Sequence, residues 1–238
     1  DLVSANRDGD NLTVFFQLSP GSFAVDPLVL GDSATPDGPV SVVAVDLDGD
    51  GDPDLVSANR DSDNLTVFFQ LSPGSFAVDP FVLGDSATTD GPVSVVAVDL
   101  DADGDLDLVS ANIDGDNLTV FFQLAPGSFA AAPLTLGGSA TTNGPVSVAV
   151  ADLDADGDQD LVSANELGFD LTVFLQLSPG SFGMAPLTLA SGGAFPTSVV
   201  ATDLDGDGDQ DLVLANRVNP PPAPVPVRGN LTVFFGGR

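Results

Sequence analysis

The string DLDGDGDPD at residues 46–54 recurs as DLDADGDLD at 99–107, DLDADGDQD at 152–160 and DLDGDGDQD at 203–211. Each copy has the form D-x-D-x-D-G-x-x-D. Aspartates at positions one, three and five can converge on one hard cation as the loop curls, and glycine at position six permits the sharp turn. The backbone carbonyl of position seven and the carboxylate of position nine can complete the shell. The spacing therefore predicts four metal loops.

The predicted ligands are the five aspartates of each loop, with the seventh position acting through its carbonyl. They are Asp46, Asp48, Asp50, Asp52, Asp54, Asp99, Asp101, Asp103, Asp105, Asp107, Asp152, Asp154, Asp156, Asp158, Asp160, Asp203, Asp205, Asp207, Asp209 and Asp211. Flexible carboxylate oxygens favour Ca²⁺ over Mg²⁺, and the lack of His and Cys argues against zinc and copper. The alternative is that Asp-Gly strings only form polar hairpins. Because five carboxylates within nine residues repel one another without a cation, we expect one structural Ca²⁺ ion per loop.

The loops belong to a repeat, since the string DLV(S/L)AN begins at residues 1, 54, 107, 160 and 211, with spacings of 53, 53, 53 and 51. The repeat units span 1–53, 54–106, 107–159, 160–210 and, incompletely, 211–238. Asp1 corresponds to the ninth position of a fifth loop. Nearly identical units occupy equivalent environments, as in a ring, arc or solenoid. We expect one repeat region over residues 1–238.

Each unit has four apolar runs separated by Gly, Pro, Asp and Asn, which predicts strands at 40–45, 55–59, 65–71 and 76–83 and their equivalents. In the third run Leu65, Val67 and Leu71 alternate with Phe68 and Gln70, so both faces of the sheet carry apolar side chains. A propeller blade needs two such faces because it packs between two neighbours. The fold class predicted is all-β, a β-propeller of four-stranded antiparallel blades. Three blades are complete, the first partial blade lacks its first strand, and the last partial blade lacks its fourth.

Composition excludes several functions. The net charge is -30, with five Arg and no Lys, so the surface repels nucleic acid and anionic membranes. No apolar stretch is long enough for membrane insertion. With no His, Cys, Lys or Tyr, a nucleophilic serine has no recognisable base, and the only glutamate, Glu166, has no obvious partner for glycoside hydrolysis. The chain is therefore predicted not to be an enzyme. The sequons at Asn11, Asn64, Asn117 and Asn230 permit N-glycosylation but also suit the start of a strand.

At these motifs the sequence resembles the FG-GAP/VCBS repeat family, which includes the calcium-binding blades of integrin α-subunit propellers and some propeller lectins. The aspartate loop followed by D-L-x-x-A-N is matched in four copies, and residues 1–6 match the end of a fifth. The PGSF string at 20–23 and the GPV string at 38–40 are similar to the family's Phe-Gly and Gly-Ala-Pro elements. The resemblance implies an extracellular or cell-surface, secreted propeller with calcium between the first and second strands of each blade.

The same resemblance implies a protein or glycan ligand on the rim opposite calcium. Candidate contacts there are Asp8, Asp10, Asp32, Asp37, Asp61, Asp63, Asp85, Asp90, Asp114 and Asp116, although Asp-Gly-Asp-Asn is also ordinary hairpin chemistry. The leading hypothesis is a non-catalytic adhesion and recognition module. One alternative is a structural subunit whose incomplete terminal blades bind a partner chain or a second copy by strand addition. A glycoside-processing enzyme is the third.

Overall fold

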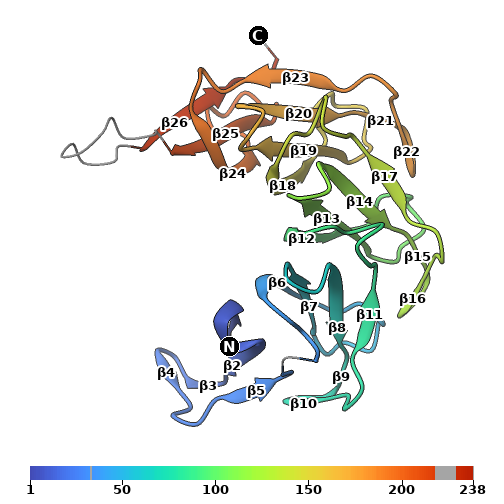
Figure 1. Ribbon diagram of the computed structural model, residues 1–238, viewed down its shortest axis with the longest axis vertical. Helices are drawn as coiled ribbons and strands as arrows, with labels where there is room; N and C mark the ends of the chain where they lie inside the picture. The colour runs from blue at the N-terminus through green and yellow to red at the C-terminus, as the bar shows by residue number, and fades with distance from the viewer. Residues whose placement is uncertain (33, 218–228, 238) are drawn as a thin grey trace.

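The computed structural model describes residues 1–32, 34–217 and 229–237, and their five larger β-sheets follow one another around an open arc (Figure 1). Three sheets have four antiparallel strands and two have three. The one helix in this described part is the short 3-10 helix η1 (Arg7–Gly9), and it lacks the length and hydropathy for a membrane span. The prediction of an all-β propeller fold with three complete and two partial blades is confirmed.

We name the sheets blades A to E in chain order. Blade A contains β1 (Leu2–Asn6), β2 (Asn11–Phe15) and β5 (Leu28–Leu30). Blade B contains β6 (Pro39–Val45), β7 (Asp54–Asn59), β8 (Asn64–Phe68) and β11 (Phe81–Leu83). Blade C contains β12 (Pro92–Val98), β13 (Asp107–Asn112), β14 (Asn117–Phe121) and β17 (Leu134–Leu136). Blade D contains β18 (Pro145–Ala151), β19 (Asp160–Asn165), β20 (Asp170–Phe174) and β23 (Leu187–Ala190). Blade E contains β24 (Phe195–Thr202), β25 (Asp211–Arg217) and β26 (Gly229–Phe234).

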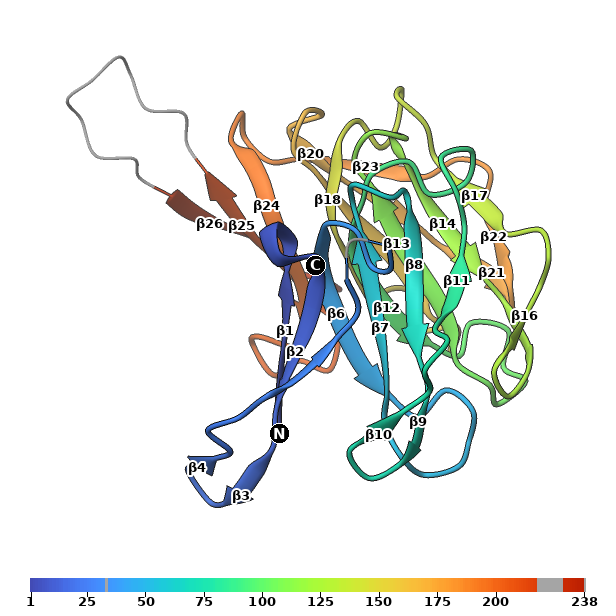
Figure 2. The same ribbon diagram turned by 60° about the horizontal axis from the view of Figure 1, so that its bottom comes forward.

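Four small hairpins project from blades A to D. They are β3 (Gln17–Ser19) with β4 (Ser22–Phe23), β9 (Gln70–Ser72) with β10 (Ser75–Phe76), β15 (Gln123–Ala125) with β16 (Ser128–Phe129), and β21 (Gln176–Ser178) with β22 (Ser181–Phe182). Figure 2 shows β3–β4 and β9–β10 at the same end of their blades. The prediction of unbroken strands over 65–71 and 76–83 is therefore wrong. The chain leaves the sheet after Phe68, and Leu71 is 65% exposed rather than buried.

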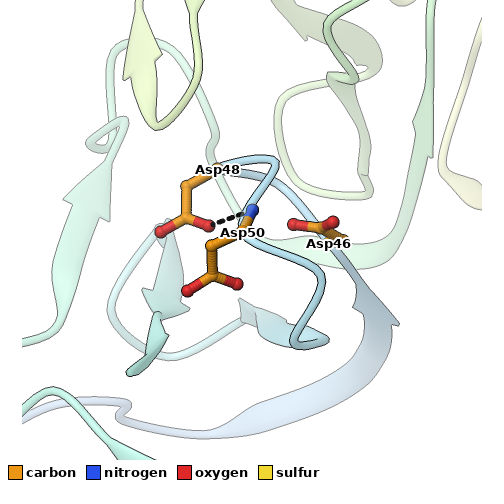
Figure 3. A group of neighbouring side chains, drawn as sticks. All are labelled: Asp46, Asp48 and Asp50. Carbon is orange, nitrogen blue, oxygen red and sulfur yellow. Dashed lines mark hydrogen bonds between the residues drawn. The ribbon is translucent and has the colours of Figure 1, made fainter. Parts of the chain in front are cut away.

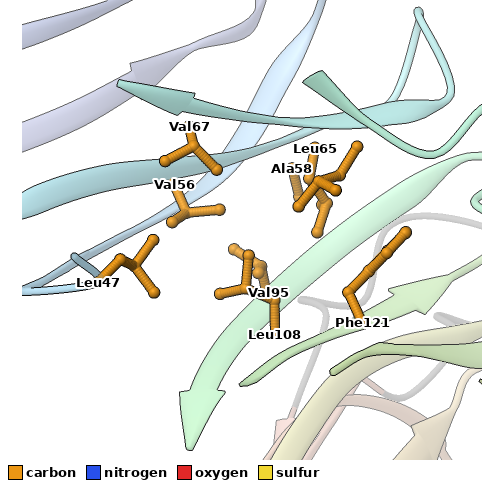
Figure 4. Close-up of a cluster of buried hydrophobic side chains, with 9 residues drawn as sticks. Leu47, Val56, Ala58, Leu65, Val67, Val95, Leu108 and Phe121 are labelled. Carbon is orange, nitrogen blue, oxygen red and sulfur yellow. The ribbon is translucent and has the colours of Figure 1, made fainter. Parts of the chain in front are cut away.

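The core lies between the blades. The innermost strands β6, β12, β18 and β24 contact one another in sequence along the arc. One apolar cluster joins Val56 and Val67 of blade B to Val95, Leu108 and Phe121 of blade C (Figure 4). Neighbouring residues of β7 face opposite sides of the sheet. Val56 belongs to this cluster, whereas Leu55 belongs to the cluster shared with blade A. Each blade is thus stabilised by burial against its neighbours.

Candidate metal centre

The four aspartate loops each join the first and second strands of a blade, and all lie at the same end of the blades as the small hairpins. Two positions in each loop have positive φ and so curl the chain. At position six, the glycines have φ between 94° and 99°. At position four, the residue is Gly49, Ala102, Ala155 or Gly206, with φ between 60° and 80°. The sequence predicted the glycine turn, but the left-handed alanines were not foreseen because alanine seldom adopts this conformation.

Hydrogen bonds within the loop turn the carboxylates inward. In loop 46–54 the Asp46 Oδ2 atom accepts from the backbone N–H of Gly51 at 2.9 Å. Asp48 accepts from the N–H of Asp50 at 3.3 Å (Figure 3), and Asp50 accepts from the N–H of Asp52 at 2.9 Å. The bonds from position six to one and from position seven to five recur in all four loops. Backbone donors therefore preorganise each group of acids.

Each loop brings three carboxylates together, with one oxygen of each lying within 4.8 Å of the others. The groups are Asp46, Asp48 and Asp50; Asp99, Asp101 and Asp107; Asp152, Asp154 and Asp160; and Asp203, Asp205 and Asp211. The fifth-position aspartates Asp103, Asp156 and Asp207 and the ninth-position Asp54 lie outside these groups. So do the side chains of Asp52, Asp105, Asp158 and Asp209, which were predicted to act through their carbonyls.

The loops offer oxygens that the protein itself does not use. The Oδ1 atoms of Asp99, Asp101 and Asp152 are buried and have no hydrogen-bond partner in the described chain. A buried carboxylate oxygen without a donor is costly, and a hard cation bound by several such oxygens offsets that cost. The residues present therefore fit a divalent cation such as Ca²⁺.

The ninth aspartate has a second role that the sequence did not reveal. Asp107 is fully buried, and its two oxygens accept from the backbone N–H groups of Leu100 at 2.9 Å and Gln123 at 2.7 Å. It thereby joins the start of the loop to the hairpin that follows the third strand. Burial raises the pKa of Asp107 to about 6, and it also raises the pKa of Asp54 and of Asp160. A cation near these groups would favour the ionised form.

The first two loops are covered by a hairpin of the next blade. Gln123 Nε2 of blade C donates to the carbonyl of Leu47 at 3.0 Å, and Gly180 N–H of blade D donates to the carbonyl of Leu100 at 2.9 Å. Leu47 and Leu100 are 2% and 1% exposed, whereas the equivalent Leu204 is 53% exposed. An open hollow of about 380 Å³ instead separates the third and fourth loops. The QLSPGSF motif, present with small changes at 17, 70, 123 and 176, was the available sequence signal for these contacts.

Comparison with known proteins agrees with this architecture. The family model described as an FG-GAP-like repeat matches residues 1–57, 46–110, 99–163 and 153–214. No curated protein sequence gives a significant match.

Three solved structures share the fold at low identity. A putative 6-phosphogluconolactonase from Bacteroides uniformis is 15% identical with a TM-score of 0.63 over 98% of this chain, and a lectin of Agrocybe aegerita that recognises non-reducing terminal N-acetylglucosamine is 16% identical with a TM-score of 0.55 over 89%. The V. cholerae biofilm matrix protein Bap1 is 17% identical with a TM-score of 0.50 over 89%. The chain spans 62%, 58% and 32% of these three chains, respectively.

Proposed function

Because the chain belongs to the FG-GAP-like repeat family, we propose that it is a non-catalytic, extracellular calcium-binding recognition module for a protein or glycan ligand. One observation carries the proposal. Four loops in equivalent positions each gather three carboxylates within 4.8 Å, and in two of the loops buried oxygens have no partner. Such all-oxygen sites suit Ca²⁺, which is abundant outside cells.

Calcium in these loops stabilises the arc rather than performing chemistry. The first two loops lie beneath hairpins of the next blade, so an ion there fixes both the loop and the junction between blades. If free calcium stands at about 100 times the dissociation constant, each site adds about 2.7 kcal/mol to the free energy of unfolding. A rigid arc then holds the loops of the opposite rim in fixed positions, as a recognition surface requires.

The side chains on that rim support recognition better than catalysis. Glu166, the only glutamate, forms an ion pair with Arg217. Its carboxylate is thus already engaged by a residue of the neighbouring blade. Similarity to the lectin and the matrix protein motivates the recognition hypothesis, and similarity to the putative lactonase, at 15% identity and a TM-score of 0.63, shows that the same fold occurs in proteins of different kinds.

The test has two parts. Metal analysis after dialysis against calcium should find about four ions per chain, one for each loop, and magnesium should not replace them. The calcium-loaded protein should then bind specific members of a glycan or protein array, and EGTA should abolish that binding. Specific binding to neither array would refute the recognition function, and absence of bound calcium would refute the metal assignment.

A further inference from the structure

The rim opposite the metal loops contains one junction that departs from the repeat. At the first three junctions, a turn aspartate of one blade accepts a hydrogen bond from a glycine N–H of the next. The pairs are Asp10 with Gly38 at 3.1 Å, Asp63 with Gly91 at 2.9 Å, and Asp116 with Gly144 at 2.8 Å. These three aspartates, which the sequence proposed as ligand contacts, therefore fasten neighbouring blades together.

At the junction of blades D and E, both positions are phenylalanine. Phe169 precedes β20 as Asp116 precedes β14, and Phe195 precedes Pro196 as Gly144 precedes Pro145. The two rings form an edge-to-face pair with centroids 4.7 Å apart and an interplanar angle of 63°. A hydrogen bond between blades has thus been replaced by an aromatic contact.

The replacement is unusual in its backbone conformation and in the apolar surface that it exposes. Phe169 has φ of 58°, a left-handed conformation that suits Gly, Asn and Asp but strains a bulky aromatic residue. Its side chain is also 38% exposed, and Leu167, where the other blades have Asp61 and Asp114, is 54% exposed. The backbone is held in place, since the N–H and hydroxyl of Ser191 both donate to the carbonyl of Phe169, at 2.9 and 2.6 Å. Local strain that exposes apolar surface suggests a functional site.

The chemistry of the junction indicates what it binds. Arg217 pairs with Glu166, and its guanidinium lies 5.6 Å from the centroid of the Phe195 ring. The carboxylate of Glu166 is engaged by Arg217, and the groups that set this junction apart from the other three are the exposed apolar parts of Phe169 and Leu167. An apolar patch with paired polar neighbours suits an apolar side chain of a protein partner better than the hydroxyl groups of a sugar.

The charge of the protein surface indicates the charge of the partner. All three arginines of the described chain, Arg7, Arg60 and Arg217, form ion pairs with acids of an adjacent blade. The surface field is therefore negative, consistent with a net charge of -30. We propose that the patch of Leu167, Phe169 and Phe195 binds a basic polypeptide segment that places an aromatic or aliphatic side chain against it. This inference rests on the recognition function proposed above.

The test uses immobilised ten-residue peptides, each with one Leu, Phe or Trp flanked by Lys or Arg, in calcium. Matched peptides carry Ala at the apolar position or Glu in place of the basic residues. The double variant Phe169→Asp with Phe195→Gly restores the pairing found at the other three junctions, and Leu167→Asp restores the residue of blades B and C without touching the phenylalanines. Leu124→Ala, an exposed residue of hairpin β15–β16, is the control.

We expect the protein to bind the basic apolar peptides and both restoring variants to bind them at least about tenfold more weakly, as for loss of an interface hot spot. The control variant should bind normally, and the alanine and glutamate peptides should fail. Equal binding by the protein and the restoring variants would overturn the site but leave the recognition function standing. If the protein bound only glycans, the peptide assignment would be wrong. If it bound neither these peptides nor any member of the glycan and protein arrays, the recognition function would fail as well.

Discussion

Asp101→Asn should remove the calcium-dependent part of stability at one loop and nothing else. Asp101 Oδ1 is buried without a hydrogen-bond partner, and the side chain lies with Asp99 and Asp107 in one cluster. At free calcium of about 100 times the dissociation constant, loss of the site should lower the free energy of unfolding by about 2.7 kcal/mol. For a chain of this size that corresponds to a fall in Tm of about 5–10 °C. Calorimetric melting in calcium and in EGTA measures the calcium-dependent and the calcium-independent parts of the stability.

The metal-free protein in EGTA is the comparison for this variant. Burial, with help from Asp103, raises the pKa of Asp101, so the ionised group is disfavoured in the metal-free fold. The Asn variant should therefore be no less stable than the parent in EGTA. The matched control is Asp105→Asn, which keeps the carbonyl and changes a carboxylate outside the cluster, with an expected effect below about 0.5 kcal/mol. An equal loss for Asp101→Asn in calcium and in EGTA would refute the metal role of this carboxylate.

Three further predictions concern packing, the hairpins and pH. Leu108→Ala, at a fully buried side chain between blades B and C, should lower the free energy of unfolding by about 2–5 kcal/mol, whereas Leu124→Ala, at a 64% exposed side chain, should stay within about 0.5 kcal/mol in the same denaturation assay. Gly180→Ala and Gly21→Ala share backbone strain of about 1–2 kcal/mol, since φ is 73° and 76°. Only the Cβ added at Gly180 would approach the second metal loop, at 3.1 Å, so only that variant should weaken calcium binding in a calorimetric titration. In EGTA, the raised pKa of Asp107 near 6 means that its contribution to stability is full below its unfolded pKa of about 4 and is lost as pH rises through 6. Calcium binds the ionised form, so the rise in Tm on adding calcium should grow between pH 4 and pH 7; a constant rise would contradict this reasoning.

The sequence predicted much of this fold because the repeat displays its own strand pattern. Alternation in 65–71 placed Leu65 and Val67 on a buried face, and both are fully buried. The same alternation failed at Leu71, because the chain leaves the sheet where the buried Asp54 accepts the N–H of Gln70. A long-range acceptor of this kind has no signal in local periodicity.

The residue types of the candidate site were predictable, but the role of each residue was not. Spacing identified the loops, since carboxylates at alternate positions share one side of a curled chain. It correctly separated Asp105, whose side chain lies outside the cluster, but it did not predict that Asp103 also lies outside the cluster or that the oxygens of Asp107 hold two backbone N–H groups. The aromatic junction of Phe169 and Phe195 was missed because each residue alone resembles a core phenylalanine. Comparison of the four junctions shows that both residues replace the Asp–Gly hydrogen bond found at the other three.

The hairpins over the first two metal loops have a consequence for how fast ions leave. The aspartates at positions one and three of the loops are half-buried in the first two loops, whereas Asp154 of the third loop and both Asp203 and Asp205 of the fourth are exposed. Loops of nearly the same sequence should therefore release calcium at different rates. Stopped-flow mixing with a chelator should show the loop at 203–211 emptying first and the two covered loops last. One repeated motif would then give the arc a graded response to falling calcium, with the exposed end loosening while the covered junctions stay intact.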